Sequence, residues 1–122
     1  MRKRLLIVED SELNRELLVQ IFEDDYDVDV AGDGETAVRL ASTSRPDLIL
    51  MDIGLPGISG LEAVRAIRGD PSLPRMPIVA VSSGVMPGDR ERALEAGCDD
   101  FVAKPLDDEA LVALVRNLLT GR

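Results

Sequence analysis

The apolar run Leu48-Ile49-Leu50-Met51, followed at once by Asp52, sets the architecture that we expect for this chain. A short, uninterrupted apolar run bounded by polar residues is typical of a strand that is buried on both faces of a sheet. Two further runs have the same form, Leu5–Val8 and Ile78–Val81, and Phe101–Ala103 is a weaker fourth. The sequence therefore predicts a sheet whose central strands are covered on both sides.

Residues 26–30, Tyr-Asp-Val-Asp-Val, differ because apolar and acidic side chains alternate. Alternation predicts a strand with one buried face, and acids on the other face discourage pairing with a foreign edge, so we expect this strand at the edge of the sheet. Apolar stripes with helical spacing lie between the strands and after the last one. The five stripes are Leu13, Leu17, Leu18 and Ile21; Ala37, Leu40 and Ala41; Leu61, Val64 and Ile67; Ala93, Leu94 and Ala96; and Leu111, Leu114, Val115 and Leu118.

The chain thus alternates strand and helix five times within its 122 residues. Helices that cross between successive strands imply a parallel sheet with helices on both faces. A polar second strand fits the flavodoxin-like strand order 2-1-3-4-5, which places that strand at an edge. We therefore predict an α/β fold, a doubly wound (βα)5 domain with a five-stranded parallel sheet, over residues 1–122.

Composition excludes several classes of function. The chain has 23 acidic and 14 basic residues, a net charge of −9 and no histidine. This balance argues against direct nucleic-acid binding, and the missing histidine excludes histidine triads and zinc–histidine sites. A single cysteine, Cys98, excludes an internal disulfide. No apolar stretch approaches the roughly 20 residues that span a bilayer. We therefore expect a cytoplasmic protein that does not bind a membrane.

Charged or hydroxyl side chains follow four of the five predicted strands. Glu9 and Asp10 follow the first strand, Asp52 the third, Ser82 the fourth and Lys104 the fifth. The carboxyl ends of parallel strands meet at one edge of the sheet, which is where ligands bind in such folds. We therefore expect these side chains to lie close together and to form the functional site.

The residue types at this edge favour phosphoryl transfer. Clustered carboxylates without nitrogen or sulfur ligands are suited to Mg²⁺, for which Mn²⁺ can substitute, and Mg²⁺ readily shares its coordination with phosphate. An ionised aspartate needs no general base to act as a nucleophile. We therefore predict phosphoryl transfer onto Asp52, with the metal, Ser82 and Lys104 neutralising the oxygens that are transferred.

The motifs at these strand ends resemble the receiver domain of two-component response regulators, in its CheY-like, single-domain form. They are Glu9-Asp10, Met51-Asp52-Ile53 with Leu55-Pro56-Gly57 downstream, Val81-Ser82-Ser83, and Phe101-Val102-Ala103-Lys104-Pro105. The resemblance covers essentially the whole chain, and the five motifs occur in the right order. It implies that Asp52 accepts a phosphoryl group from a sensor histidine kinase or a histidine phosphotransfer protein.

The same resemblance implies roles for the other residues. Glu9, where the family more commonly has aspartate, Asp10, Asp52 and the backbone carbonyl of Gly54 would hold Mg²⁺. Lys104 would pair with a phosphoryl oxygen, and the Lys104-Pro105 peptide bond would be cis. Ser82 and Phe101 would change conformation together as the switch.

The implied output is a changed protein surface. Phosphorylation would alter the face formed by the last strand and the helices on either side of it, and so control a downstream protein target. The protein would catalyse only its own phosphorylation and dephosphorylation. It would be a monomer, and dimerisation on phosphorylation through the same face is left open. No output segment follows the last predicted helix before Arg122, so output would pass through protein contacts, unless the chain is part of a longer regulator or hybrid kinase.

Two other interpretations remain open. A pseudo-receiver would share the fold and bind partners without phosphorylation. A small phosphatase of the haloacid-dehalogenase type would also use a nucleophilic aspartate and Mg²⁺. However, it needs a second acid two residues after the nucleophile, where this chain has Gly54.

A further motif, Gly32-Asp33-Gly34-Glu35-Thr36-Ala37, fits the dinucleotide-binding pattern. It follows the edge strand, however, and carries acids where phosphate would bind. We therefore predict a turn and a helix start at these residues.

Overall fold

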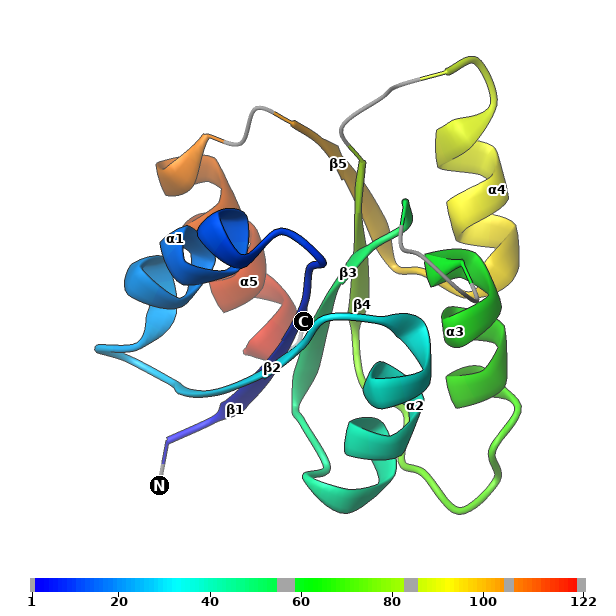
Figure 1. The fold of residues 1–122 in the computed structure, drawn as a ribbon, viewed down its shortest axis with the longest axis horizontal. Coiled ribbons are helices and arrows are strands. Elements are labelled where there is room, and N and C mark those ends of the chain that lie inside the picture. Colours follow the sequence, from blue (N-terminus) through cyan, green and yellow to red (C-terminus); the bar gives the residue numbers. More distant parts are fainter. Residues whose placement is uncertain (1, 55–58, 83–85, 105–106, 121–122) are drawn as a thin grey trace.

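The structure is a computed structural model that describes residues 2–54, 59–82, 86–104 and 107–120. Within these residues strands and helices alternate along the chain (Figure 1). The strands are β1 (Arg4–Val8), β2 (Asp27–Ala31), β3 (Leu48–Asp52), β4 (Ile78–Ser82) and β5 (Asp100–Ala103). The helices are α1 (Glu12–Phe22), α2 (Gly34–Thr43), α3 (Gly60–Arg68), α4 (Asp89–Ala96) and α5 (Asp108–Leu119).

The strands form one parallel sheet in the order β2-β1-β3-β4-β5. The predicted strand order is therefore confirmed, including the position of β2 at an edge. Each predicted strand is present, and the bounds shift by one residue at several ends. In particular, β3 includes Asp52 and β4 includes Ser82 as their last residues, paired with Val81 and Ala103 respectively. The sheet itself therefore fixes the main chain of both polar residues.

Two layers of helices cover the sheet (Figure 1). Helices α1 and α5 lie on one face, and α2, α3 and α4 lie on the other. The side chains of β1 alternate between the two cores, with Leu5 and Ile7 facing α1 and α5, and Leu6 and Val8 facing the other three helices. None of the described helices is long and apolar enough to cross a membrane.

One predicted helix face is partly wrong. Leu18 of α1 is buried, but Leu13 and Leu17 are 65% and 50% exposed. At about 100° per residue, the four leucine and isoleucine positions span too wide an arc for a single contact with the sheet. Phe22, one turn after Leu18, completes the buried stripe instead.

The helix ends follow the local sequence closely. Asp107 accepts a hydrogen bond from the Ala110 N–H and caps α5. Gly97 ends α4 with a φ of 120°, a conformation that favours glycine. Asp33 accepts the Thr36 N–H at 2.7 Å, and this bond lowers the pKa of its carboxyl. The dinucleotide-like motif is therefore a turn and a capped helix start, as predicted.

Asp99 ties together the amino ends of β4 and β5, opposite the edge where the candidate site lies. Its carboxylate accepts hydrogen bonds from the Ile78 N–H, from Arg68 of α3 and from Arg75, each at 2.8 Å. Arg68 also donates to the carbonyl of Gly97 at 2.9 Å. The end of α3, the end of α4 and the start of β5 are thus held at one point.

Cys98 gives a first testable prediction. The side chain is buried, and burial raises the pKa of its thiol from 9.0 to about 11. At pH 8 the native thiolate fraction is small, so we expect a disulfide reagent to modify the native protein about 100-fold more slowly than the unfolded chain.

The raised pKa of Cys98 also predicts a dependence of stability on pH. The thiol loses its proton at a lower pH in the unfolded chain than in the native protein, so the contribution of Cys98 to stability falls as pH rises from 9 to 11. Cys98→Ala should show a weaker loss of stability between pH 8 and 11 in urea unfolding; an unchanged loss would contradict this assignment.

Candidate functional site

The polar residues that follow the strands meet at the carboxyl edge of the sheet. β1 leads into Glu9 and Asp10, β3 and β4 end in Asp52 and Ser82, and β5 leads into Lys104. Because β1, β3, β4 and β5 are consecutive in the sheet, residues distant in sequence become neighbours. The predicted convergence is therefore observed.

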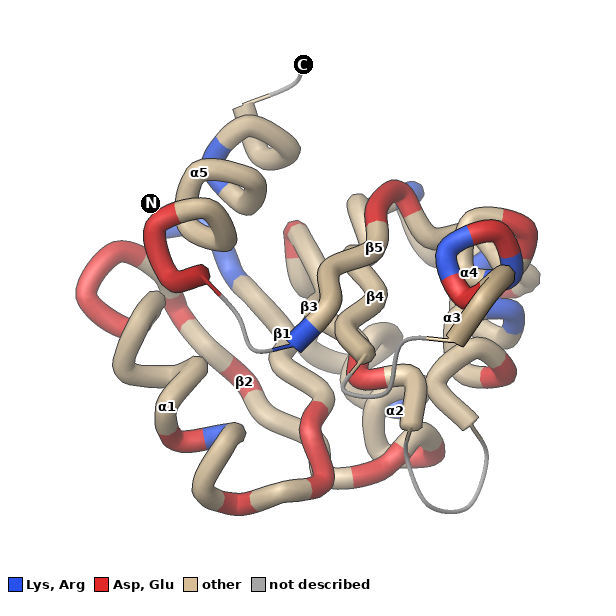
Figure 2. The backbone as a smooth tube through the Cα atoms, turned by 90° about the horizontal axis from the view of Figure 1, so that it is seen from above, with Lys and Arg blue, Asp and Glu red and all other residues tan. Residues whose placement is uncertain are grey.

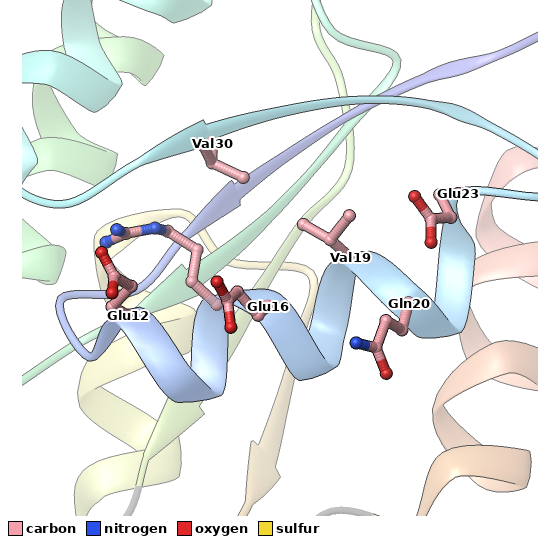
Figure 3. Close-up of a pocket in the computed structure, with 7 residues that line it drawn as sticks. Glu12, Glu16, Val19, Gln20, Glu23 and Val30 are labelled. Atoms are coloured by element: carbon pink, nitrogen blue, oxygen red, sulfur yellow. The ribbon is translucent and has the colours of Figure 1, made fainter.

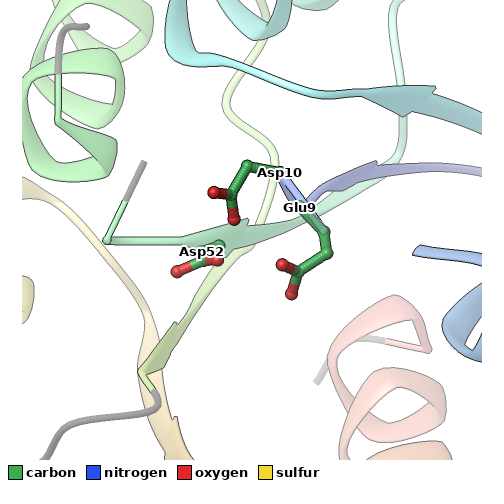
Figure 4. Close-up of side chains that lie close together, drawn as sticks. All are labelled: Glu9, Asp10 and Asp52. Carbon is green, nitrogen blue, oxygen red and sulfur yellow. The ribbon is translucent and has the colours of Figure 1, made fainter. Parts of the chain in front are cut away.

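Three carboxylates form the centre of this edge (Figure 4). One oxygen each from Glu9, Asp10 and Asp52 lies within 4.8 Å of the others. Their environments differ: Glu9 and Asp52 are only 2% and 7% exposed, whereas Asp10 is exposed. Like charges this close repel each other, so the cluster needs a cation.

Lys104 supplies part of that positive charge. Its Nζ donates to Glu9 Oε1 at 2.7 Å and lies 3.8 Å from Asp52 Oδ2. The other carboxylate oxygen of Glu9 accepts the Ser11 N–H at 3.1 Å. The sequence did not predict that Lys104 bonds to Glu9, because this contact depends on how far the longer glutamate side chain reaches across the edge.

Asp52 is held by its main chain and by one side-chain bond. The Ile53 N–H donates to the Val81 carbonyl at 3.1 Å, which fixes the chain directly after Asp52. Oδ1 of Asp52 accepts the Gly54 N–H at 2.9 Å. Oδ2 is the oxygen that faces Lys104. The two oxygens of this carboxylate therefore have different surroundings.

Gly60, which the sequence analysis missed, positions the first turn of α3 against Asp52. A Cβ on Gly60 would overlap the Asp52 carbonyl oxygen and lie 2.5 Å from Ile53 Cα. Only glycine allows this close approach of helix to strand. A signal was present in the sequence: Ser59 and Glu62 form a capping box, which marks a helix start directly before this glycine.

The remaining predicted residues lie around this centre. Ser82 is 6% exposed at the end of β4, and its carbonyl accepts the Lys104 N–H at 2.8 Å. Phe101 is half-buried and packs against the core under α2, α3 and α4. Ser83, Pro105 and the stretch Leu55-Pro56-Gly57 lie outside the described residues. The cis peptide bond at Lys104-Pro105 therefore stays a prediction.

A doubly wound sheet with acids, a hydroxyl and a lysine at its carboxyl edge defines a class of small signalling domains. The sequence model of the response regulator receiver domain matches residues 5–116, so the chain belongs to the receiver-domain family. Members of this family act as signalling switches in two-component systems.

Related response regulators and a solved receiver-domain structure support this assignment. The polar-differentiation response regulator DivK of Brucella anthropi is 38% identical over 120 residues, which cover 98% of each chain. The response regulator PleD of Caulobacter vibrioides is 40% identical over 119 residues, which cover 97% of this chain and 26% of PleD. The chain thus spans about a quarter of the length of PleD. Among solved structures, the receiver domain of the sensor histidine kinase PA1611 from Pseudomonas aeruginosa matches with a TM-score of 0.90 and 34% identity, covering 99% of this chain and all of that one.

The chemistry of the carboxylate cluster fits a divalent cation. Receiver domains bind Mg²⁺ at an acidic pocket, and the PA1611 domain was crystallised with a magnesium ion coordinated in its active-site cleft. Here three carboxylates each offer an oxygen, and the exposed Asp10 leaves one side open to solvent. Hard oxygen ligands with room for water are the environment that Mg²⁺ prefers. The residues at this edge therefore suit the ion that the family binds.

Proposed function

We propose that residues 1–122 act as one receiver unit, a switch controlled by phosphorylation of Asp52. The phosphoryl donor would be a phosphohistidine on a sensor histidine kinase or a histidine phosphotransfer protein. The single observation that carries this proposal is the position of Lys104, whose Nζ lies 3.8 Å from Asp52 Oδ2 and 2.7 Å from Glu9 Oε1. A partly buried cation between two carboxylates at a strand end is poised to receive an anionic group.

The surroundings of Asp52 support one of its oxygens as the nucleophile. Oδ1 accepts the Gly54 N–H, so Oδ2 is the oxygen that would form the bond to phosphorus. The phosphorus–nitrogen bond of the donor would break, and the leaving imidazole would keep the electron pair of that bond and take a proton from water. Lys104 Nζ would then exchange its contact with Glu9 for one with a phosphoryl oxygen, with Ser82 at the neighbouring strand end as a second donor.

Glu9, Asp10, Asp52 and the carbonyl of Gly54 would hold the metal in this scheme. When bound, Mg²⁺ or Mn²⁺ supplies the charge that neutralises the transferring oxygens. Asp10 is the exposed member of the cluster and so the readiest ligand, whereas both carboxylate oxygens of Glu9 already have protein partners. We therefore infer that Glu9 takes part mainly by holding Lys104 until the metal or the phosphoryl group arrives.

The output would pass through the face formed by α4, β5 and α5 to a downstream protein. Arg90 of α4 reaches across to β5, where it pairs with Asp100 at 3.4 Å and donates to the Phe101 carbonyl at 3.4 Å. Arg90 thus links α4 to the main chain of β5 at Phe101, next to the predicted switch side chain. Leu94 of α4 is 42% exposed and offers an apolar contact for a partner or for a second phosphorylated copy.

Intact mass measurement tests the phosphorylation step. Incubation with acetyl phosphate and Mg²⁺ should add one phosphoryl group, and a chelator should prevent the addition. Asp52→Asn should abolish it, because the amide is not a nucleophile of comparable strength. Asp24→Asn, at an exposed turn away from the site, is the matched control and should be labelled like the wild type.

Each alternative function predicts a different outcome. An unchanged mass under all conditions would favour a pseudo-receiver that binds partners without phosphorylation. Continuous turnover of a phosphomonoester would favour a phosphatase of the haloacid-dehalogenase type. Equal labelling of the Asp52→Asn variant would place the acceptor elsewhere and reject the proposal.

A further inference from the structure

Strand β2 presents an open edge. Among the described residues it pairs only with β1, through bonds that include Asp27 N–H to the Lys3 carbonyl and Glu9 N–H to the Ala31 carbonyl. In a parallel strand, the N–H and C=O of one residue face the same side, and those of the next residue face the opposite side. The main-chain groups of Val28 and Val30 therefore point away from β1. Such an edge can accept a further strand.

A groove of about 500 Å³ runs beside this edge, between β2 and α1 (Figure 3). Val30 is 42% exposed, although it belongs to the sheet, and Val19 of α1 is half-buried. Both valines thus give the groove an apolar strip bordered by polar side chains. The lining residues are Glu12, Arg15, Glu16, Val19, Gln20, Glu23 and Val30.

The charge of the groove is strongly negative. Glu12, Glu16 and Glu23 face it, and the single cation in its lining, Arg15, donates to the main-chain carbonyl of Glu9 at 3.0 Å. Figure 2 shows further acidic positions in the turn that joins β2 to α1, whereas Asp27 and Asp29 of β2 itself are paired with Arg2 and Arg4. The whole chain carries a net charge of −9. This surface is complementary to a positively charged partner.

The same charges argue against a second copy of this chain as the occupant. Pairing two β2 edges would bring the glutamates of both α1 helices together, and among the described residues these lack the arginine partners that Asp27 and Asp29 of β2 have. Like charges placed opposite each other across strands are destabilising. A basic segment meets the same hydrogen-bonding edge without this repulsion.

We propose that the groove between α1 and β2 docks an extended, basic segment of a partner protein. The segment adds as a strand beside β2, bonding to the main chain of Val28 and Val30. Its apolar side chains pack on Val19 and Val30, and its lysines or arginines lie near Glu16 and Glu23. This contact does not depend on phosphorylation of Asp52, so its test stands or falls separately from the proposed function.

Nuclear magnetic resonance of the ¹⁵N-labelled full chain tests the proposal with a short blocked peptide in which every second residue is threonine and the residues between are alternately valine and arginine, so that valine and arginine share the face turned toward α1. Chemical shifts should change along α1 and β2. At saturation, amide exchange at Val28 and Val30 should slow at least about 10-fold, because both N–H groups acquire acceptors. The same peptide with glutamate in place of arginine is the charge control and should produce neither effect.

Two variants separate the backbone and charge contributions. Val30→Pro removes one outward N–H, a change that edge strands tolerate, and should abolish peptide binding while the amide signals of β1 and β3 stay in place. Glu16→Gln combined with Glu23→Gln should weaken binding about 10-fold, whereas Glu35→Gln on α2 should not.

Three results would overturn the proposal: no binding of the basic peptide to the wild type, chemical-shift changes outside α1 and β2, or equal binding of the peptide to Val30→Pro. Protection that rises with protein concentration alone would instead identify a second copy as the occupant.

Discussion

Lys104→Ala should lower the free energy of unfolding by about 3 kcal/mol in metal-free buffer. Lys104 is the cation that bonds to Glu9, which is only 2% exposed, and it lies 3.8 Å from Asp52. Removing it leaves two buried carboxylates and Asp10 without a compensating charge from the lysine. Urea unfolding with and without Mg²⁺ measures the effect, and the ion should restore part of the lost stability.

The same variant should be phosphorylated by acetyl phosphate about 100-fold more slowly, because one donor to the transferring group is lost. Lys3→Ala provides the matched control, since Lys3 is exposed, lies away from the site and is the other lysine in the chain. If Lys104→Ala and Lys3→Ala behave alike in both stability and labelling rate, the role assigned to Lys104 is wrong.

Gly60→Ala should destabilise the protein by about 3 kcal/mol, although alanine ordinarily favours a helix over glycine. The added Cβ would overlap the Asp52 carbonyl oxygen and press on Ile53, and both obstacles are main chain that cannot rotate aside. We expect α3 to move away from the end of β3, and the labelling rate of Asp52 to fall with it.

Gly54→Ala is the matched control for this prediction. A Cβ on Gly54 would meet only Asp52 Oδ1, at 3.6 Å, which is an ordinary contact. Urea unfolding of both variants compares the two positions, and intact mass after acetyl phosphate treatment compares the labelling of Gly60→Ala with that of the wild type. A Gly60→Ala variant as stable as the wild type would show that the helix start does not need glycine.

The sequence predicted the order of the sheet and the residues at its carboxyl edge because both depend on short-range patterns. Apolar runs such as Leu48–Met51 mark strands that are buried on both faces, and the next polar residue must then emerge at the strand end. Asp52 and Lys104 are placed in this way by the strands themselves. Topology then brings them together, because β3 and β5 are parallel and only β4 lies between them.

Features that depend on the packing of one element on another were predicted less well. The apolar stripe of α1 includes Leu13 and Leu17, yet the helix rests on the sheet through Leu18 and Phe22. Similarly, the alternation in β2 predicted a buried apolar face, but Val30 is 42% exposed beside the groove. Periodicity gives the helix or strand, whereas the angle at which it meets its neighbour decides which apolar side chains are covered.

Contacts between side chains could not be predicted at all from spacing. Glu9 and Lys104 are separated by 94 intervening residues, since their hydrogen bond has a sequence separation of 95. Their bond depends on side-chain length and on the absence of a nearer partner. For Gly60, the capping box of Ser59 and Glu62 marks the helix start, but no local pattern encodes how close this start lies to the end of β3.

The strands are apolar along their length and polar at their carboxyl ends, and this separation affects which positions of the chain can vary. Side chains of β3 and β4 fill the two cores, whereas the groups at the carboxyl edge contribute little to those cores. Replacing a loop there alters the chemistry without dismantling the framework beneath it. Variation at the carboxyl edge can therefore proceed while the apolar contacts of the two cores are retained.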